Sequence, residues 1–155
     1  MSKKYPVIAI TGSSGSGTST VRESFQHIFT RDGIDADIIE GDAFHRYERH
    51  EMDELIKKNR HKSDIDFSHF SPDANLLSDL AKTFHQFGKN GKYKTRRYVH
   101  TEEQAIIFKQ KTGSMTPWEN ASSELLFYEG LHGGYVGQGA NVAKHVDLLV
   151  GVVPI

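Results

Sequence analysis

Short apolar runs alternate with longer amphipathic stretches along most of this chain. Four runs predict strands, at residues 5–11, 36–40, 124–129 and 146–153, and the first is continuous in apolar residues, as buried parallel strands are. Between them, apolar residues recur at helical spacing, which predicts helices over residues 17–30, 49–58 and 76–87. Alternating strands and helices favour a mostly parallel sheet with helices on both faces, so we expect a three-layer α/β fold.

The remaining segments predict loops and one further strand. Residues 64–75 are rich in Ser, Asp and Pro and predict a loop, and the glycines at 88 and 91 predict a turn. We expect residues 92–99 to form one arm of a hairpin. With 155 residues and no internal repeat, the chain fits a single domain spanning residues 1–155.

The last predicted strand stands at the end of the sequence. A central parallel strand is normally followed by a crossover helix. We therefore expect residues 1–155 to be an N-terminal portion of a longer chain, with a natural C-terminal strand as the alternative.

Composition limits the classes of partner and compartment. The 19 basic and 20 acidic residues give a net charge of −1, which provides no general argument for binding nucleic acid or a membrane surface. The absence of cysteine excludes a disulfide frame and a cysteine-based zinc site. No run is apolar enough to span a bilayer, and the first strand begins too early to leave room for a signal peptide. We therefore expect a cytoplasmic protein.

Residues 12–20 carry the clearest chemical signal. They lie between the first strand and the first helix and predict a P-loop, whose pattern is G-x-x-x-x-G-K-[ST]. Gly12, Gly17 and Ser19 fit this pattern, but Thr18 stands where a lysine is expected. The residues expected to contact ATP are Gly12, Ser13, Ser14, Gly15, Ser16, Gly17, Thr18, Ser19 and Thr20.

Such a loop binds phosphate mainly through its backbone. Glycines allow a tight curl in which successive N–H groups face one concavity, and the following helix adds its positive dipole end. Ser19 would supply an oxygen to Mg²⁺, and Thr20 could hydrogen-bond a phosphate or cap the helix. The alternative is a flexible Gly/Ser linker, which the flanking strand and helix disfavour.

Two carboxylates follow predicted strands, at the sheet edge where ligands bind in folds of this type. Asp42 follows the second strand and could take the proton from an acceptor hydroxyl in a kinase; it could equally be the N-cap of a short helix. Glu129 ends the third strand, like a Walker-B acid with Glu in place of Asp, and would hold Mg²⁺ directly or through water. Asp147 precedes its strand, so we prefer Glu129.

Basic and histidine side chains supply candidates for binding an anion. His45 and Arg49 are four residues apart and would share one face of a helix, although their charged neighbours favour a solvated surface. In residues 92–100, basic side chains alternate with aromatic ones. Such a segment could bind a sugar phosphate, form the charged face of a hairpin or, as a less economical explanation, bind nucleic acid. Trp118 is expected to pack in a turn.

Four segments resemble bacterial phosphoribulokinases: residues 12–20, then Glu-Gly-Asp-Ala-Phe-His-Arg-Tyr at 40–47, Arg-Tyr-Val-His-Thr-Glu-Glu at 97–103 and Phe-Tyr-Glu-Gly-Leu-His-Gly at 127–133. The resemblance extends in order along essentially the whole chain. It implies the fold of the nucleoside-monophosphate kinases. It also implies transfer of the γ-phosphate of MgATP to O1 of D-ribulose 5-phosphate, which gives ribulose 1,5-bisphosphate for carbon fixation in the Calvin cycle.

The same resemblance implies roles for individual residues. Asp42 becomes the catalytic base, Glu129 the metal carboxylate, and His45, Arg49 and His100 become contacts for ribulose 5-phosphate. Threonine at position 18 is also found in the bacterial family, whose cationic side chains come from Lys and Arg residues after the last strand seen here. Family members are homo-oligomers activated by NADH and inhibited by AMP, and Arg31 is a candidate for that effector chemistry.

Three other functions stay open. Residues 66–73 resemble the acceptor-side loop of uridine kinases, but a nucleoside kinase of that type should have lysine at position 18. Thr18 and an incomplete C-terminal part would also suit a non-catalytic nucleotide-binding module. The third alternative, a nucleic-acid-dependent ATPase, is supported by the basic and aromatic residues at 92–100 alone.

Overall fold

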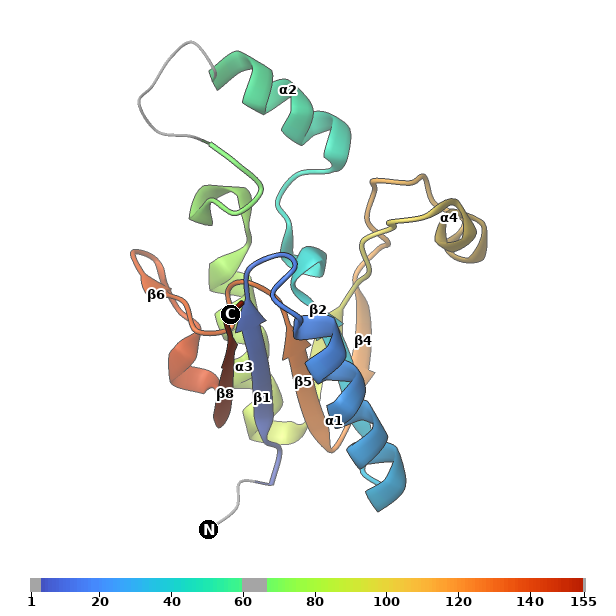
Figure 1. Cartoon of the computed structure of the whole chain (residues 1–155), viewed down its shortest axis with the longest axis vertical. Helices are drawn as coiled ribbons and strands as arrows, with labels where there is room; N and C mark the ends of the chain where they lie inside the picture. The colour runs from blue at the N-terminus through green and yellow to red at the C-terminus, as the bar shows by residue number, and fades with distance from the viewer. Residues whose placement is uncertain (1–3, 60–66, 155) are drawn as a thin grey trace.

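A four-stranded sheet forms the centre of the structure, a computed structural model that describes residues 4–59 and 67–154 (Figure 1). Its strands are β1 (Val7–Gly12), β2 (Ala36–Glu40), β5 (Leu125–Glu129) and β8 (Leu148–Val152). They lie in the order β2-β5-β1-β8, and each neighbouring pair is parallel. The ends of each strand lie within two residues of those of a predicted strand, and the expected α/β fold is confirmed.

The other elements connect or cover these strands. The helices are α1 (Thr18–Asp32), α2 (Arg49–Asn59), α3 (Leu77–Asn90) and α4 (Glu102–Phe108). The short 3₁₀ turns are η1 (Gly41–Phe44), η2 (Pro72–Ala74) and η3 (Ala143–His145). Two small antiparallel ribbons pair β3 (Lys92–Thr95) with β4 (Glu119–Ser122) and β6 (Val136–Gly137) with β7 (Ala140–Asn141).

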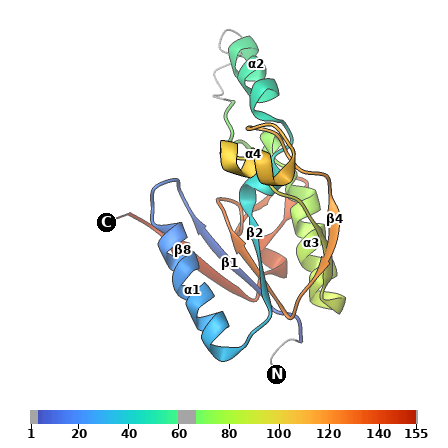
Figure 2. The same cartoon turned by 90° about the vertical axis from the view of Figure 1, so that its right-hand side faces the viewer.

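Helices α1 and α3 cover opposite faces of the sheet, as Figure 2 shows. On one face, Phe25 and Phe29 of α1 contact Phe127, with ring centroids 5.2 and 5.5 Å away. On the other, Phe84 of α3 contacts Tyr128 at 5.5 Å. Because successive strand residues point to opposite faces, the neighbouring residues Phe127 and Tyr128 of β5 pack against α1 and α3, respectively.

The structure corrects the predicted turn and hairpin. Helix α3 passes through Gly88 and ends only at Asn90, where it is capped by Gly91, whose φ of 71° favours glycine. The buried side chains of Phe84 and Phe87 outweigh the cost of about 1 kcal/mol for a glycine inside a helix. Strand β3 pairs with β4, which the sequence pattern did not reveal, and α4 lies on the connection between them.

The structure describes most of the predicted loop at residues 64–75. Of the predicted loop at 64–75, residues 64–66 lie outside the described residues; the rest contains η2. The described part of the chain contains no helix with the length and apolar character needed to cross a bilayer.

Candidate functional site

The candidate site lies where three adjacent strands end. Glu129 of β5 pairs in register with Ile10 of β1 on one side and with Glu40 of β2 on the other. The P-loop, Glu129 and the turn containing Asp42 therefore come together at one edge of the sheet. They line a cleft of about 590 Å³, as expected for ligand binding at the carboxyl ends of parallel strands.

The loop between β1 and α1 has the backbone geometry of a phosphate cradle. Gly15 and Gly17 have φ values of 80° and 97°, which favour glycine. A Cβ at Gly12 would come within 2.4 Å of Ser16 Oγ and 2.7 Å of the Val152 carbonyl oxygen, so this position also requires glycine. The hydroxyl of Ser16 is buried without a hydrogen-bond partner among the described residues, which leaves a polar group for a ligand to satisfy.

The first turn of α1 is open to an anion. Its N-cap is Gly17, and no side chain caps the helix, so the proposed capping role of Thr20 is wrong. The first backbone N–H groups of a helix have no partner within the helix itself, and together with the helix dipole they attract phosphate. The residues present therefore fit the triphosphate of ATP.

Ser19 and Glu129 meet in the cleft, as their positions in the sequence suggested. Ser19 Oγ donates a 3.2 Å hydrogen bond to Glu129 Oε1. A hydroxyl and a carboxylate suit Mg²⁺, which takes few protein ligands and completes its shell with water and substrate phosphates. No group of three His, Cys, Asp or Glu side chains suited to a metal occurs in residues 4–59 and 67–154.

Arg22 also lines the cleft, although the sequence pattern did not identify it as a site residue. Its Nη1 lies 2.9 Å from Glu129 Oε2 and 3.1 Å from Glu40 Oε1, so one guanidinium bridges the ends of β5 and β2. The available signal was its spacing: Arg22 follows Thr18 by four residues and so shares its face of α1.

Asp42 lies between two histidines. Its Oδ1 is 3.1 Å from His45 Nε2 and its Oδ2 is 3.3 Å from His100 Nε2. The hydrogen bond to His45 is the main reason that the pKa of Asp42 lies below the usual range, and partial burial opposes it. The N-cap of η1 is Glu40, so the alternative in which Asp42 caps the turn is wrong.

His45 and Arg49 are not on one helix, contrary to the predicted spacing. His45 follows η1 with an extended backbone (φ −58°, ψ 137°), and α2 begins only at Arg49. Both side chains contact Tyr98, whose ring lies 5.6 Å from the His45 ring and 5.9 Å from the Arg49 guanidinium carbon. His45 lines the cleft, whereas Arg49 is exposed and lies beside Gly113.

The side chains of the basic segment at 92–100 lie in different surroundings. Arg96 donates to the carbonyl oxygens of Ala43 (2.7 Å) and His45 (2.6 Å) and stacks on Trp118, with its guanidinium carbon 4.4 Å from the ring centre. It therefore supports the Asp42 turn from behind, and burial lowers its pKa. The predicted packing of Trp118 in a turn is wrong, because the residue is 39% exposed, lies outside a turn and offers its ring to Arg96. Of this segment, only His100 lines the cleft.

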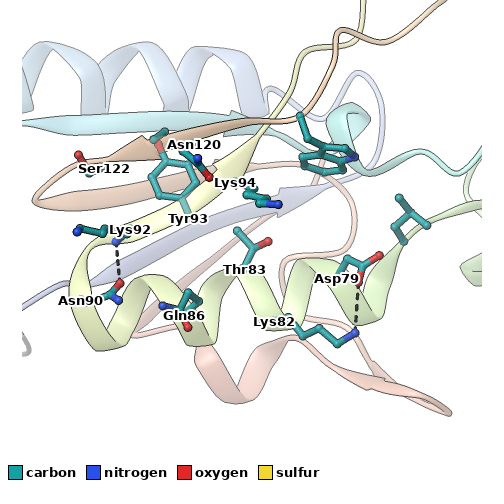
Figure 3. Close-up of a pocket in the computed structure, with 13 residues that line it drawn as sticks. Asp79, Lys82, Thr83, Gln86, Asn90, Lys92, Tyr93, Lys94, Asn120 and Ser122 are labelled. Atoms are coloured by element: carbon teal, nitrogen blue, oxygen red, sulfur yellow. Dashed lines mark hydrogen bonds and ion pairs between the residues drawn. The ribbon is translucent and has the colours of Figure 1, made fainter.

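A larger groove of about 880 Å³ lies between α3 and the β3–β4 ribbon (Figure 3). Lys92 and Lys94 border it on the ribbon, and the ion pair of Asp79 with Lys82 (3.4 Å) borders it on the helix. It contains none of the candidate catalytic residues. We assign the functional site to the smaller cleft because the titratable groups and the P-loop converge there.

Comparison with known proteins identifies relatives of the whole chain. Residues 7–155 match the Phosphoribulokinase / Uridine kinase family. A phosphoribulokinase of Sinorhizobium medicae is 49% identical over 156 residues, which cover 100% of this chain and 54% of the relative. The chain thus spans about half the length of the curated relatives it matches.

Solved structures agree with this assignment. The structure of phosphoribulokinase from Rhodobacter spheroides superposes with a TM-score of 0.86 at 44% identity, covering 99% of this chain and 53% of that one. A structure described as a possible uridine kinase from Bacillus stearothermophilus has a TM-score of 0.65 at 17% identity, covering 97% of this chain and 72% of that one. At that identity the second likeness concerns the fold alone.

Proposed function

We propose a function from the premise that this chain belongs to the Phosphoribulokinase / Uridine kinase family. The protein that contains it transfers the γ-phosphate of MgATP to O1 of D-ribulose 5-phosphate, giving ADP and ribulose 1,5-bisphosphate for the Calvin cycle. The observation that carries this proposal is the juxtaposition of Asp42, flanked by His45 and His100, with the Ser19–Glu129 pair. Residues 1–155 act as one kinase domain within a longer chain.

In the proposed reaction, Asp42 accepts the proton of the O1 hydroxyl as O1 attacks the γ-phosphorus. The new O1–P bond forms while the bond from phosphorus to the bridging oxygen breaks, and ADP leaves with that electron pair. A carboxylate with a lowered pKa is ionised at neutral pH, so an oxygen lone pair is available to the hydroxyl proton. The P-loop backbone holds the phosphates in line, which is the main requirement of phosphoryl transfer.

Ser19 and Glu129 would hold Mg²⁺, which neutralises charge on the transferred phosphoryl group when bound. Arg22 is the only Lys or Arg among the described residues that line the cleft, and we assign it part of the positive charge that Thr18 does not supply. By family resemblance, further cationic side chains follow position 155.

The acceptor binds beside Asp42 through the histidines. His45 and His100 both face the base, and their rings suit the hydroxyls and the phosphate of a sugar phosphate. We keep Arg49 as a contact for the phosphate end of the acceptor, because it contacts the same Tyr98 ring as His45. Assembly into a homo-oligomer and responses to NADH and AMP, with Arg31 as the candidate residue, stay predictions.

The test is a coupled assay on the full-length protein. ADP formation is measured with ATP and Mg²⁺ in the presence of ribulose 5-phosphate, uridine or neither, and the product is identified by ³¹P NMR. We expect turnover only with ribulose 5-phosphate. Phosphorylation of uridine would favour the nucleoside kinase, and tight ATP binding without turnover would favour the non-catalytic module.

A further inference from the structure

A buried asparagine contacts His45, the histidine beside the proposed catalytic base. Asn75 stands between η2 and α3 and is 3% exposed. Its Nδ2 donates to the carbonyl oxygens of His69 and Ser71, both at 2.9 Å, and its Oδ1 lies 3.0 Å from His45 Nδ1. All the polar atoms of this side chain therefore have partners.

These contacts determine which way the amide points. An amide group has two hydrogens on nitrogen and none on oxygen, and both hydrogens are used on carbonyl oxygens. The flipped amide would set its oxygen against those two carbonyl oxygens, so both 2.9 Å contacts would join two acceptors with no hydrogen between them. Oδ1 therefore faces His45, and because it can only accept, Nδ1 of His45 must carry a hydrogen.

The opposite side of the ring then meets a carboxylate. His45 Nε2 lies 3.1 Å from Asp42 Oδ1. A neutral ring with its hydrogen on Nδ1 would present a lone pair from Nε2 to an oxygen that also has only lone pairs. A second proton must therefore lie between these two atoms. The lowered pKa of Asp42, whose main cause is this hydrogen bond, agrees with that arrangement.

We propose that Asn75 is a positioning residue that keeps a hydrogen on Nδ1 of His45 and so requires a shared proton between His45 and Asp42. Whenever Asp42 is ionised, the ring is then positively charged. His45 attracts an anionic acceptor through this charge and fixes the plane of the carboxylate. Oδ2 of Asp42 keeps a lone pair for the acceptor proton beside its contact with His100. The identity of the acceptor rests on the proposed function, whereas the proton arrangement does not.

The proton arrangement can be measured directly. The full-length protein is labelled with ¹⁵N-histidine, and His45 is identified in long-range ¹H–¹⁵N spectra by the signal lost in His45→Gln. We expect a protonated Nδ1 in the wild-type protein at neutral pH. A neutral His45 with a bare Nδ1 would overturn the proposal, and this measurement needs no variant at position 75.

Asn75→Leu removes the acceptor while keeping a similar volume. We expect His45 to change to a neutral ring with its hydrogen on Nε2, donated to Asp42, and the KM for ribulose 5-phosphate to rise about tenfold through loss of the charge. The KM for ATP should change little. Unchanged His45 signals in a folded Asn75→Leu protein would contradict the proposal.

Ser71→Ala serves as the matched control. It removes the 2.9 Å bond from the Ser68 amide to Ser71 Oγ, and so loosens the same loop without touching the Asn75 amide. We expect wild-type His45 signals; loss of the Nδ1 hydrogen here would mean that the loop, rather than Asn75, decides the proton's position. Wild-type protein that shows the Nδ1 hydrogen but does not phosphorylate ribulose 5-phosphate would refute the proposed function and leave this inference intact.

Discussion

Ser19 donates a hydrogen bond of 3.2 Å to Glu129, and so connects the first turn of α1 to the end of the neighbouring strand β5. The two residues are 110 positions apart in the chain. Their contact assembles the two protein oxygens that suit Mg²⁺ at the edge of the P-loop.

Glu129→Gln should lower kcat/KM by roughly a hundredfold or more, because an amide oxygen lacks the charge that holds the cation against the phosphates. The measurement is turnover as a function of Mg²⁺ concentration, where the variant should need more Mg²⁺. Ser19→Ala should act in the same direction. Ser24→Ala is the control, since that hydroxyl bonds to the Thr20 carbonyl of its own helix. Equal Mg²⁺ dependence in wild type and Glu129→Gln would remove the metal role.

Asp42→Asn should reduce kcat by about 10²- to 10⁴-fold, because an amide cannot accept the acceptor proton. Nucleotide affinity, followed by isothermal titration calorimetry, should stay close to wild type. Asp79→Asn is a matched control in the separate groove beside α3. Near-normal turnover of Asp42→Asn would show that another group is the base.

Arg22→Met should weaken binding of MgATP about tenfold, because it removes the positive charge from the cleft and leaves Glu40 and Glu129 facing each other without a cation. The effect is read from KM for ATP and from direct titration with the nucleotide. Arg31→Met, which removes a similar charge from an exposed pair with Asp32, should not change either value. If both variants behaved alike, Arg22 would have no special place in the site.

Gly130→Ala should destabilise the fold by about 1–3 kcal/mol and lower activity. The added Cβ would lie 2.5 Å from the Tyr128 hydroxyl and 2.9 Å from Gly41 Cα, the residue before Asp42. Because Gly130 follows Glu129 directly, the shift would disturb both carboxylates. Gly151→Ala is the control, because no atom of the described residues lies within 4 Å of the added Cβ. Urea denaturation and the coupled assay measure the two effects, and wild-type values for Gly130→Ala would contradict this crowding.

Stability should fall in mild acid partly because of His132. Burial lowers the pKa of His132 from 6.5, against the opposing hydrogen bond to the Phe70 carbonyl. Below pH 6.5 the unfolded chain therefore binds this proton more readily than the folded chain. Stability present above that pH is lost as the pH falls, by up to about 1.4 kcal/mol per unit. His132→Gln should flatten the dependence of unfolding free energy on pH between 7.5 and 5.5, with pH 8 as the internal reference. An unchanged slope would show that another group is responsible.

Local pattern was sufficient for the elements that form the sheet. The predicted strand at 36–40 coincides with β2, because its adjacent residues Ile38 and Ile39 point to opposite faces of the sheet and pack in separate hydrophobic clusters. Helix α4 escaped this reasoning, since its apolar residues Ile106 and Ile107 are exposed and mark no buried face. A start signal was present, however: Thr101 caps the helix through the Gln104 amide at 3.2 Å.

The sequence by itself determined the P-loop, the parallel α/β fold and the candidates Ser19, Asp42 and Glu129, because motif spacing and strand ends are local properties of the chain. Only the tertiary structure decided that Asp42 lies between His45 and His100, that Arg22 bridges two carboxylates, and that Arg49 stands apart from His45. The physical reason is strand order: β5 lies between β1 and β2, although more than 80 residues separate it from either in the chain. No local pattern records which distant strand ends will meet.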